Sequence, residues 1–212
     1  MALEFWFEFA STYSYPAAMR VEELARSQGV PLVWKAMLLG PIFRAQGWND
    51  SPFNLYPAKG RYMWRDLERI CAGLAIPFRR PTQFPRNSLL AARIACRFGG
   101  EPWLEEFVRS VFRANFAEDQ DIADPTVLAG ILERLDQPAG AVLEEAQSPE
   151  SKEKLRMRME RAAALGIFGA PTFVAGEELF WGNDRLEAAL SWYRERGQDE
   201  RSWRAGPLPM KS

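Results

Sequence analysis

The chain has 212 residues, enough for one substantial core or for a compact domain with a second domain inserted into it. Its 27 basic and 28 acidic residues nearly cancel and are scattered, which predicts no nucleic-acid partner and no anionic-membrane partner. Histidine is absent, which excludes serine–histidine catalysis, cysteine–histidine catalysis and most zinc sites.

Two further features of the composition concern the compartment. The N-terminus lacks the pattern of a signal peptide and no apolar run is long enough to span a bilayer, so we expect a soluble, cytoplasmic protein. Cys71 and Cys96 are the only cysteines, and they form no Cys-x-x-Cys pair. They predict neither a disulfide framework nor a thiol redox centre.

The first forty residues have the pattern of a strand, a helix and a second strand. Over residues 3–9, one leucine and three phenylalanines occupy every second position, and Glu4, Trp6 and Glu8 lie between them. This alternation predicts a strand. Apolar residues recur at helical spacing over residues 13–28, and residues 30–39 are rich in β-forming side chains. This opening therefore resembles a βαβ unit.

From Gly40 the pattern changes to helical periodicity, with proline and glycine between the segments. The expected helices cover residues 60–74, 86–98, 102–115, 125–134, 139–147 and 149–166. Two short strands, 171–175 and 178–181, and a last helix, 184–195, follow. Strands at both ends of the chain are expected to form one four-stranded sheet.

This order predicts an α/β sheet domain that is interrupted by a helical insertion. The sheet domain takes residues 1–40 and 148–196, and the inserted all-helical domain takes residues 41–147. Residues 197–212 are rich in charge, glycine and proline, and we expect a loosely ordered tail there.

A loop with several hydroxyl groups follows the first strand and contains Ser11 and Thr12. Either residue has a plain structural explanation, because serine and threonine are favoured helix N-caps. The same position allows a function, since the amides and the positive dipole end of a helix N-terminus stabilise an anion such as a thiolate. The sequence alone leaves both interpretations open.

A second candidate segment joins a helix to a strand across the bond between Ala170 and Pro171. In a purely structural interpretation, the proline marks the first residue of a strand or an edge strand. We expect this bond to be cis, which would leave the amide and the carbonyl of Ala170 facing outward and able to pair with an extended peptide.

A third candidate segment, residues 180–185, contains Asn183 and Asp184 just before the last helix. Either side chain suits an N-cap. As a site, a helix N-terminus beside a carboxylate can hold both the carboxylate and the ammonium of an amino-acid group. Both interpretations are open here as well.

Six segments occur in an order and at a spacing that together identify a family. They are FWFEFAS at 5–11, YSY at 13–15, LLGPIF at 38–43, YM with DL at 62–67, FGAPT at 168–172 and FWGNDR at 180–185. Each is weak alone, but together they resemble the 2-hydroxychromene-2-carboxylate isomerases across nearly the whole chain. That family belongs to the DsbA-like branch of thioredoxin folds and is close to the kappa-class glutathione transferases.

The resemblance implies a thioredoxin-like (DsbA/kappa-type) sheet domain with an inserted all-helical domain, glutathione as cofactor and a homodimer. It assigns activation of glutathione to Ser11 and binding of the tripeptide to six further residues. These are Ala170, Pro171, Trp181, Gly182, Asn183 and Asp184. It assigns the small aromatic substrate to Phe43, Arg44 and Asn54.

The implied reaction interconverts 2-hydroxychromene-2-carboxylate and trans-o-hydroxybenzylidenepyruvate by reversible addition of a thiolate to the conjugated double bond, which can then rotate. A free thiol titrates near 8.5, so Ser11 is expected to serve as a hydrogen-bond donor that favours the thiolate, not as the nucleophile. Arg44 and Asn54 suit the pyruvyl carboxylate and the enolate that develops on addition.

Two residues depart from the family pattern. Thr12 stands where the family commonly has proline, which is expected to loosen the turn that aims Ser11. Ala170 stands where valine is common, and it contributes backbone atoms in either case. Two alternatives stay open: a kappa-like glutathione S-transferase that releases a conjugate, and a noncatalytic thioredoxin-fold protein that binds peptides.

Overall fold

The computed structural model describes residues 2–204 of the chain, and the side chains of residues 2–196. Within these residues the strands form one sheet in the order β2-β1-β3-β4. The strands are β1 (Leu3–Phe7), β2 (Leu32–Ala36), β3 (Thr172–Ala175) and β4 (Glu178–Trp181). β1 runs parallel to β2 and antiparallel to β3. The prediction of one four-stranded sheet from both ends of the chain is confirmed.

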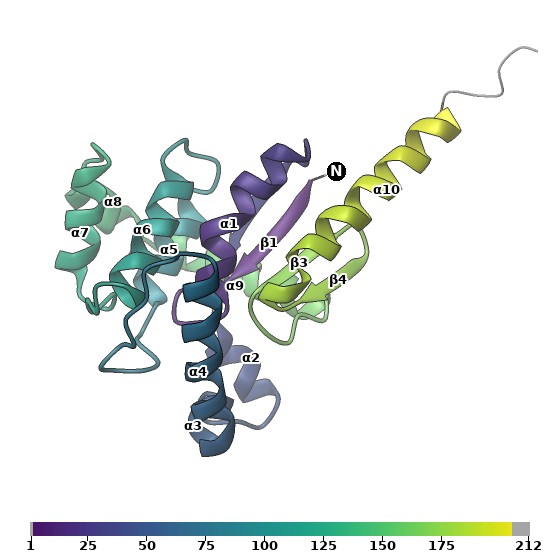
Figure 1. The fold of residues 1–212 in the computed structure, drawn as a ribbon. Coiled ribbons are helices and arrows are strands. Elements are labelled where there is room, and N and C mark those ends of the chain that lie inside the picture. The colour runs from purple at the N-terminus through teal and green to yellow at the C-terminus, as the bar shows by residue number, and fades with distance from the viewer. Residues whose placement is uncertain (1, 205–212) are drawn as a thin grey trace, which may run out of the picture.

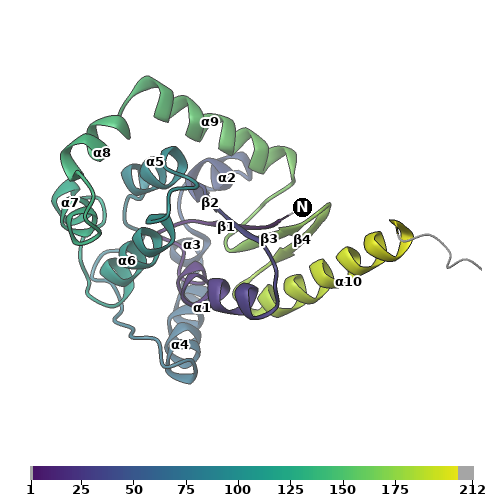
Figure 2. The same cartoon turned by 90° about the horizontal axis from the view of Figure 1, so that it is seen from above.

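Helices cover both faces of this sheet and extend beyond its end (Figure 1; Figure 2). They are α1 (Ser14–Ser27), α2 (Leu39–Ala45), α3 (Pro52–Leu55), α4 (Pro57–Gly73), α5 (Leu89–Arg97), α6 (Leu104–Phe116), α7 (Pro125–Arg134), α8 (Ala139–Glu145), α9 (Pro149–Ala164), the 3-10 turn η1 (Asn183–Arg185) and α10 (Leu186–Arg204). In the view from above, α9 arches along one side of the sheet, while α1 and α10 lie on the other (Figure 2). Among the described residues, no helix is long and apolar enough to cross a membrane.

β1 lies at the centre of the sheet and is buried on both faces, which explains why apolar residues fill both of its faces. Phe5 and Phe7 pack edge-on against Trp34 of β2, and Phe5 stacks on Phe173 of β3. Trp6 points to the opposite face, where it joins a smaller cluster with apolar residues of α2 and α9. The alternation in the sequence therefore separates two cores, not a core from solvent.

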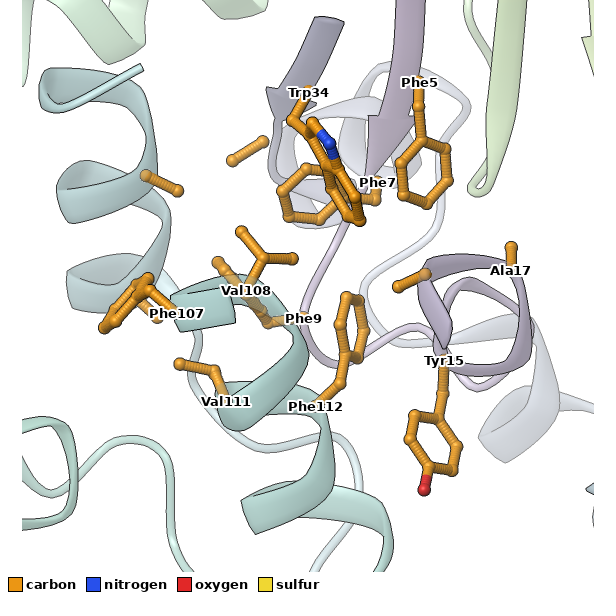
Figure 3. Packing of buried hydrophobic residues seen from close by; sticks show 14 of the residues in the cluster. Phe5, Phe7, Phe9, Tyr15, Ala17, Trp34, Phe107, Val108, Val111 and Phe112 are labelled. Atoms are coloured by element: carbon orange, nitrogen blue, oxygen red, sulfur yellow. The ribbon is translucent and has the colours of Figure 1, made fainter. Parts of the chain in front are cut away.

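The larger core continues past the end of β1 into the helices, as Figure 3 shows. Phe9 lies 5.3 Å from Phe112 of α6, and Phe112 in turn lies 6.3 Å from Tyr15 of α1, measured between ring centroids. One cluster of buried side chains thus joins the sheet to the helical region. The division into a sheet domain and an inserted helical domain at residues 41 and 147 stays a prediction, because the two parts share this core.

The helix predicted at 86–98 begins later than expected. α5 starts at Leu89, whose amide donates a hydrogen bond to Asn87 Oδ1 at 2.9 Å. The side chains of Arg86 and Ser88 are buried in contacts with other segments, which holds residues 86–88 outside the helix.

The sequence did not predict α2 or α3. The expected strand ran to residue 39 and the first expected helix of the insertion began at residue 60, but α2 occupies Leu39–Ala45 and α3 occupies Pro52–Leu55. Ser51 Oγ accepts the Phe53 amide at 3.3 Å and proline follows the cap, so α3 has an N-cap signal but is too short to show periodicity.

The last helix is longer than the predicted 184–195. α10 begins at Leu186 after η1 and continues to Arg204, into the first part of the segment 197–212 that was expected to be loosely ordered. Gly197 costs about 1 kcal/mol relative to alanine in a helix, which does not stop it, and no proline occurs before residue 207. Residues 205–212 of the expected tail lie outside the described residues.

Candidate active site

A cavity of about 1560 Å³ opens at the carboxyl end of β1. Its wall on one side comes from the loop after β1, from residues 168–170 and from residues 181–185. The opposite wall comes from α2, α3 and α4 and from the loop 84–88. The volume exceeds that of a pocket for one drug-sized ligand, so two small molecules can share it.

Ser11 lies in the wall of this cavity, and 8% of its surface is exposed. Its Oγ donates a hydrogen bond to the Ala170 carbonyl oxygen at 3.1 Å and accepts one from the Ser14 amide at 3.3 Å. The first bond joins positions 159 residues apart, and the second reaches the first residue of α1, whose amide is shared with the Ser11 carbonyl oxygen at 3.2 Å. The hydroxyl therefore caps the helix and also faces a peptide carbonyl.

Ala170 and Pro171 differ in their relation to the cavity. The peptide bond between them is cis, as the sequence predicts. Ala170 lines the cavity, whereas Pro171 is buried behind it and accepts the Gly182 amide on its carbonyl oxygen at 2.9 Å. This bond ties the loop before β3 to the segment after β4.

Trp181 forms part of the cavity rim together with Phe168. The two ring centroids lie 4.9 Å apart at an interplanar angle of 61°, and about half of each side chain is exposed. The indole covers Gly169 closely, because a Cβ at that position would lie 2.5 Å from Trp181 Nε1. Gly182, which follows, has a φ of 118°, a value that favours glycine.

Asn183 and Asp184 have different surroundings. Asn183 is buried, and both its carbonyl and its Oδ1 accept hydrogen bonds from Arg20 of α1 at 3.2 Å. Its side chain is thus directed to α1, which corrects the interpretation of Asn183 as a cap of the last helix. Asp184 is exposed in the cavity wall, 3.5 Å from the guanidinium of Arg185.

The three residues assigned to the aromatic substrate are not all brought together. Phe43 and Arg44 of α2 line the cavity, and the ring of Phe43 packs 5.7 Å from that of Trp48. Asn54 does not line it, because its amide donates to both carboxylate oxygens of Asp50 at 3.1 and 3.2 Å.

Thr12 and Tyr13 anchor the loop after β1 to α4. Thr12 Oγ1 lies 3.1 Å from the sulfur of Met63, and the Tyr13 hydroxyl donates to Asp66 Oδ2 at 3.0 Å. Thr12 is buried, so the residue that replaces the family's proline has a partner of its own. The expected loosening of the turn is offset by these contacts.

Glu8 is a site residue that the sequence analysis missed. Only 5% of it is exposed, and it lines the cavity three residues before Ser11. Its Oε2 accepts the Ala10 amide at 2.9 Å and its Oε1 accepts the hydroxyl of Ser88. Burial raises the pKa of this carboxyl to about 7, although these two hydrogen bonds lower it. The signal was present as an acid at the end of an apolar strand pattern, but alternation alone does not show that this position is buried.

Comparisons with known proteins agree with this geometry. Residues 2–194 match the family described as DSBA-like thioredoxin domain. The chain belongs to the DSBA-like thioredoxin family. It is 30% identical over 192 residues to 2-hydroxychromene-2-carboxylate isomerase of Sphingobium xenophagum, which covers 90% of this chain and 96% of that protein.

Two further similarities support the same relationship. Glutathione S-transferase kappa 1 of Homo sapiens is 27% identical over 224 residues, covering 98% of this chain and 94% of that protein. The solved structure of a 2-hydroxychromene-2-carboxylate isomerase superposes with a TM-score of 0.83 at 28% identity, covering 94% of this chain and 98% of that one. The family resemblance and the thioredoxin-like fold predicted from the sequence are confirmed.

Proposed function

We propose that this protein is a glutathione-dependent cis–trans isomerase that interconverts 2-hydroxychromene-2-carboxylate and trans-o-hydroxybenzylidenepyruvate-type substrates. The observation that carries the proposal is the 3.1 Å hydrogen bond between Ser11 Oγ and the Ala170 carbonyl, in the cavity wall at the N-terminus of α1. A hydroxyl donor and a peptide carbonyl that lie this close suit the sulfur and the amide of one cysteinyl residue.

The residues around Ser11 fit glutathione, an anionic tripeptide. Ala170 offers backbone atoms at the cavity wall for pairing with an extended peptide. Asp184 offers an exposed carboxylate for an ammonium group, and Arg185 beside it offers a cation for a carboxylate. Trp181 supplies an apolar face between these ends of the site.

When bound, glutathione supplies a nucleophilic sulfur that adds reversibly to the conjugated double bond. The chain's own contribution is to hold that sulfur ionised. When glutathione binds, the single proton of Ser11 Oγ turns from the Ala170 carbonyl to the sulfur, and the α1 N-terminus contributes its positive dipole end. Each unit by which the thiol pKa falls corresponds to about 1.4 kcal/mol of preferential stabilisation of the thiolate.

The helical wall of the cavity receives the aromatic substrate. Phe43 and Trp48 offer apolar ring surface, and Arg44 offers a bidentate donor for a carboxylate. Asn54 has no part in this proposal, because Asp50 holds its amide. Asn87, which lines the cavity, offers an amide in its place.

The test follows the ultraviolet absorbance of 2-hydroxychromene-2-carboxylate incubated with the protein in the presence and absence of glutathione. We expect conversion only when glutathione is present. S-methylglutathione, which keeps the tripeptide but has no thiol, should bind without supporting conversion. Conversion at the same rate without any thiol would contradict the proposal.

The similarity to the human kappa-class transferase favours a second candidate, a glutathione S-transferase. Mass spectrometry of the product separates the two activities. An isomerase returns a product with the mass of the substrate, whereas a transferase releases a product heavier by one glutathione. A protein that only binds peptides would retain glutathione or other peptides and yield neither product.

A further inference from the structure

The segment that leads into Ser11 leaves the sheet before it reaches the site. β1 ends at Phe7, whose register partner is Ala36, so Glu8 and Phe9 continue without a strand partner. Buried backbone groups outside a sheet need other hydrogen-bond partners. Two side chains supply such partners: that of Glu8 itself, and that of Asn115 in the helical region.

The first contact runs through Glu8. Its carboxyl accepts the Ala10 amide on one oxygen and the Ser88 hydroxyl on the other. Ser88 lies just before α5, so this carboxyl connects the loop that carries Ser11 to the helical region. Both Glu8 and Ser88 are 5% exposed.

The second contact runs through Asn115 of α6. Its Nδ2 donates to the Phe9 carbonyl oxygen at 3.0 Å. The orientation of this amide is fixed from behind, since Arg86 Nη1 donates to Asn115 Oδ1 at 3.0 Å. Arg86 also forms an ion pair with Asp119, and it is itself 6% exposed.

These polar side chains lie next to the aromatic core, since Phe9, which follows Glu8, packs on Phe112 of α6 (Figure 3). An apolar residue at Glu8 would avoid the desolvation of a carboxyl group. The groups converge on the two residues that precede the Ala10–Ser11 step, from the segment before α5 and from α6. This convergence distinguishes them from isolated buried polar groups elsewhere in the core.

We propose that Glu8, Ser88 and Asn115 are positioning residues that hold the segment before Ser11, so that the Ser11 hydroxyl, which donates to the Ala170 carbonyl in this structure, is placed to donate its one proton to the sulfur that binds there. The proposal rests on the proposed function for its catalytic consequence. Its structural part, that the segment before Ser11 is held in place, rests only on the contacts of Glu8 and Phe9.

The test compares three variants of buried serines. Ser88→Ala removes the donor to Glu8 with little change in volume, and Ser88→Thr keeps a hydroxyl. Ser151→Ala is the matched control, because Ser151 is also fully buried but donates to the Glu145 carbonyl, away from the cavity. Amide hydrogen exchange at Ala10 and Ser11, measured without glutathione, reports on the loop itself.

We expect Ser88→Ala to speed exchange at Ala10 by about tenfold, a free-energy change of about 1.4 kcal/mol. With glutathione bound, its thiolate absorbance should titrate at a pH higher by about half a unit, and kcat should fall by about three- to tenfold. KM for glutathione should change by less than about twofold, since the tripeptide contacts remain. Ser88→Thr should recover most of each change.

Glu8→Gln gives an independent check, because its amide can still donate to Ser88 while its carbonyl accepts the Ala10 amide. At pH 4, where the Glu8 carboxyl of the wild type is protonated as well, exchange at Ala10 should therefore stay within about twofold of the wild-type rate. Loosening as large as in Ser88→Ala would contradict positioning by these hydrogen bonds.

Two different failures can be told apart. If Ser88→Ala matches Ser151→Ala in loop exchange, thiolate titration and kcat, the positioning proposal is overturned. If the wild-type protein does not bind glutathione, the proposed function is wrong, and loop exchange still decides whether Glu8 and Ser88 hold the segment.

Discussion

The two walls of the cavity are built in different ways. The wall next to the sheet consists of backbone atoms and buried polar groups, held by bonds between distant segments such as Ser11 with Ala170. The wall formed by α2, α3 and α4 consists mainly of side chains, some of which contact close neighbours in the sequence. Phe43 packs on Trp48 and Lys59 lies 4.7 Å over the ring of Tyr56.

This difference separates two tasks. The sheet-side wall depends on the fold, because its geometry requires strands from both ends of the chain to meet. The helical wall can change its side chains without changing the sheet. We therefore expect the first wall to determine how the thiol is activated, and the second to determine which aromatic substrate is accepted.

Glu8→Gln should change stability in a pH-dependent way. Burial raises the pKa of Glu8 from 4.5 to about 7. Between these values the unfolded chain loses a proton that the folded chain keeps, so stability falls as the pH rises through this window. The full shift corresponds to about 3 kcal/mol above pH 7. Glutamine cannot ionise, so the variant should be more stable than wild type by up to about 3 kcal/mol at pH 8.

Denaturant unfolding at pH 4 and pH 8 checks this prediction. The two proteins should differ little at pH 4, where the carboxyl is protonated in both states. Glu68→Gln on the exposed face of α4 is the control and should show no such gain at pH 8. An equal change at both pH values would show that the carboxyl's charge is not the cause.

Ser11→Ala should reduce turnover. The variant loses a hydrogen bond to a charged sulfur, worth about 1.5 to 3 kcal/mol, so kcat at neutral pH should fall about ten- to a hundredfold or more. Glutathione affinity, measured by calorimetry, should change less because Ala170 and residues 181–184 remain. Ser27→Ala, at the opposite end of α1, is the control and should keep wild-type kcat. Ser11→Cys should not rescue activity, since a thiol is a weaker donor.

Arg44→Met should weaken binding of the aromatic carboxylate and leave glutathione binding intact. Loss of a charge-assisted contact at an exposed site should raise KM for the aromatic substrate by about tenfold. Arg61→Met on α4 is the matched control, because Arg61 is exposed and does not line the cavity. If Arg44→Met instead shifted the thiolate titration, the division of tasks between the walls would be wrong.

Gly169→Ala should have a small effect on glutathione binding. The added Cβ would lie 2.5 Å from Trp181 Nε1, but this indole is about half exposed and can move aside. We expect Kd for glutathione to rise by about two- to fivefold, with kcat nearly unchanged. Gly99→Ala, where a Cβ would meet ordinary contacts of 3.5 Å, should leave Kd unchanged. A larger loss in kcat than in affinity would show that Trp181 acts on the reacting atoms.

Strand alternation and helical periodicity are local signals, and they were sufficient for most elements of this fold. α7 and β4 occur at the predicted bounds, and β1 and α1 end within two residues of them. α2 and α3 escaped prediction because seven and four residues are too few to show a helical period.

The candidate site was predictable where motifs carry it and not where burial does. Ser11 and Ala170 lie in recognisable segments, and the structure brings them together. Glu8 was treated only as one of the residues that alternate with the phenylalanines, because the sequence does not reveal that the helical region covers the segment after Phe7. Asn54 was assigned by analogy with the family. No motif predicts that its amide donates a hydrogen bond to Asp50 instead.

Whether Ser11 stabilises the thiolate of bound glutathione is measured by the ultraviolet titration of glutathione bound to the wild-type protein and to Ser11→Ala. We expect the thiolate band of the wild-type complex to appear well below the unperturbed thiol pKa of about 8.5 and to shift to higher pH in the variant. A band that titrates at the same pH in both proteins, with an unchanged isomerisation rate, would show that Ser11 only caps α1 and does not activate the sulfur.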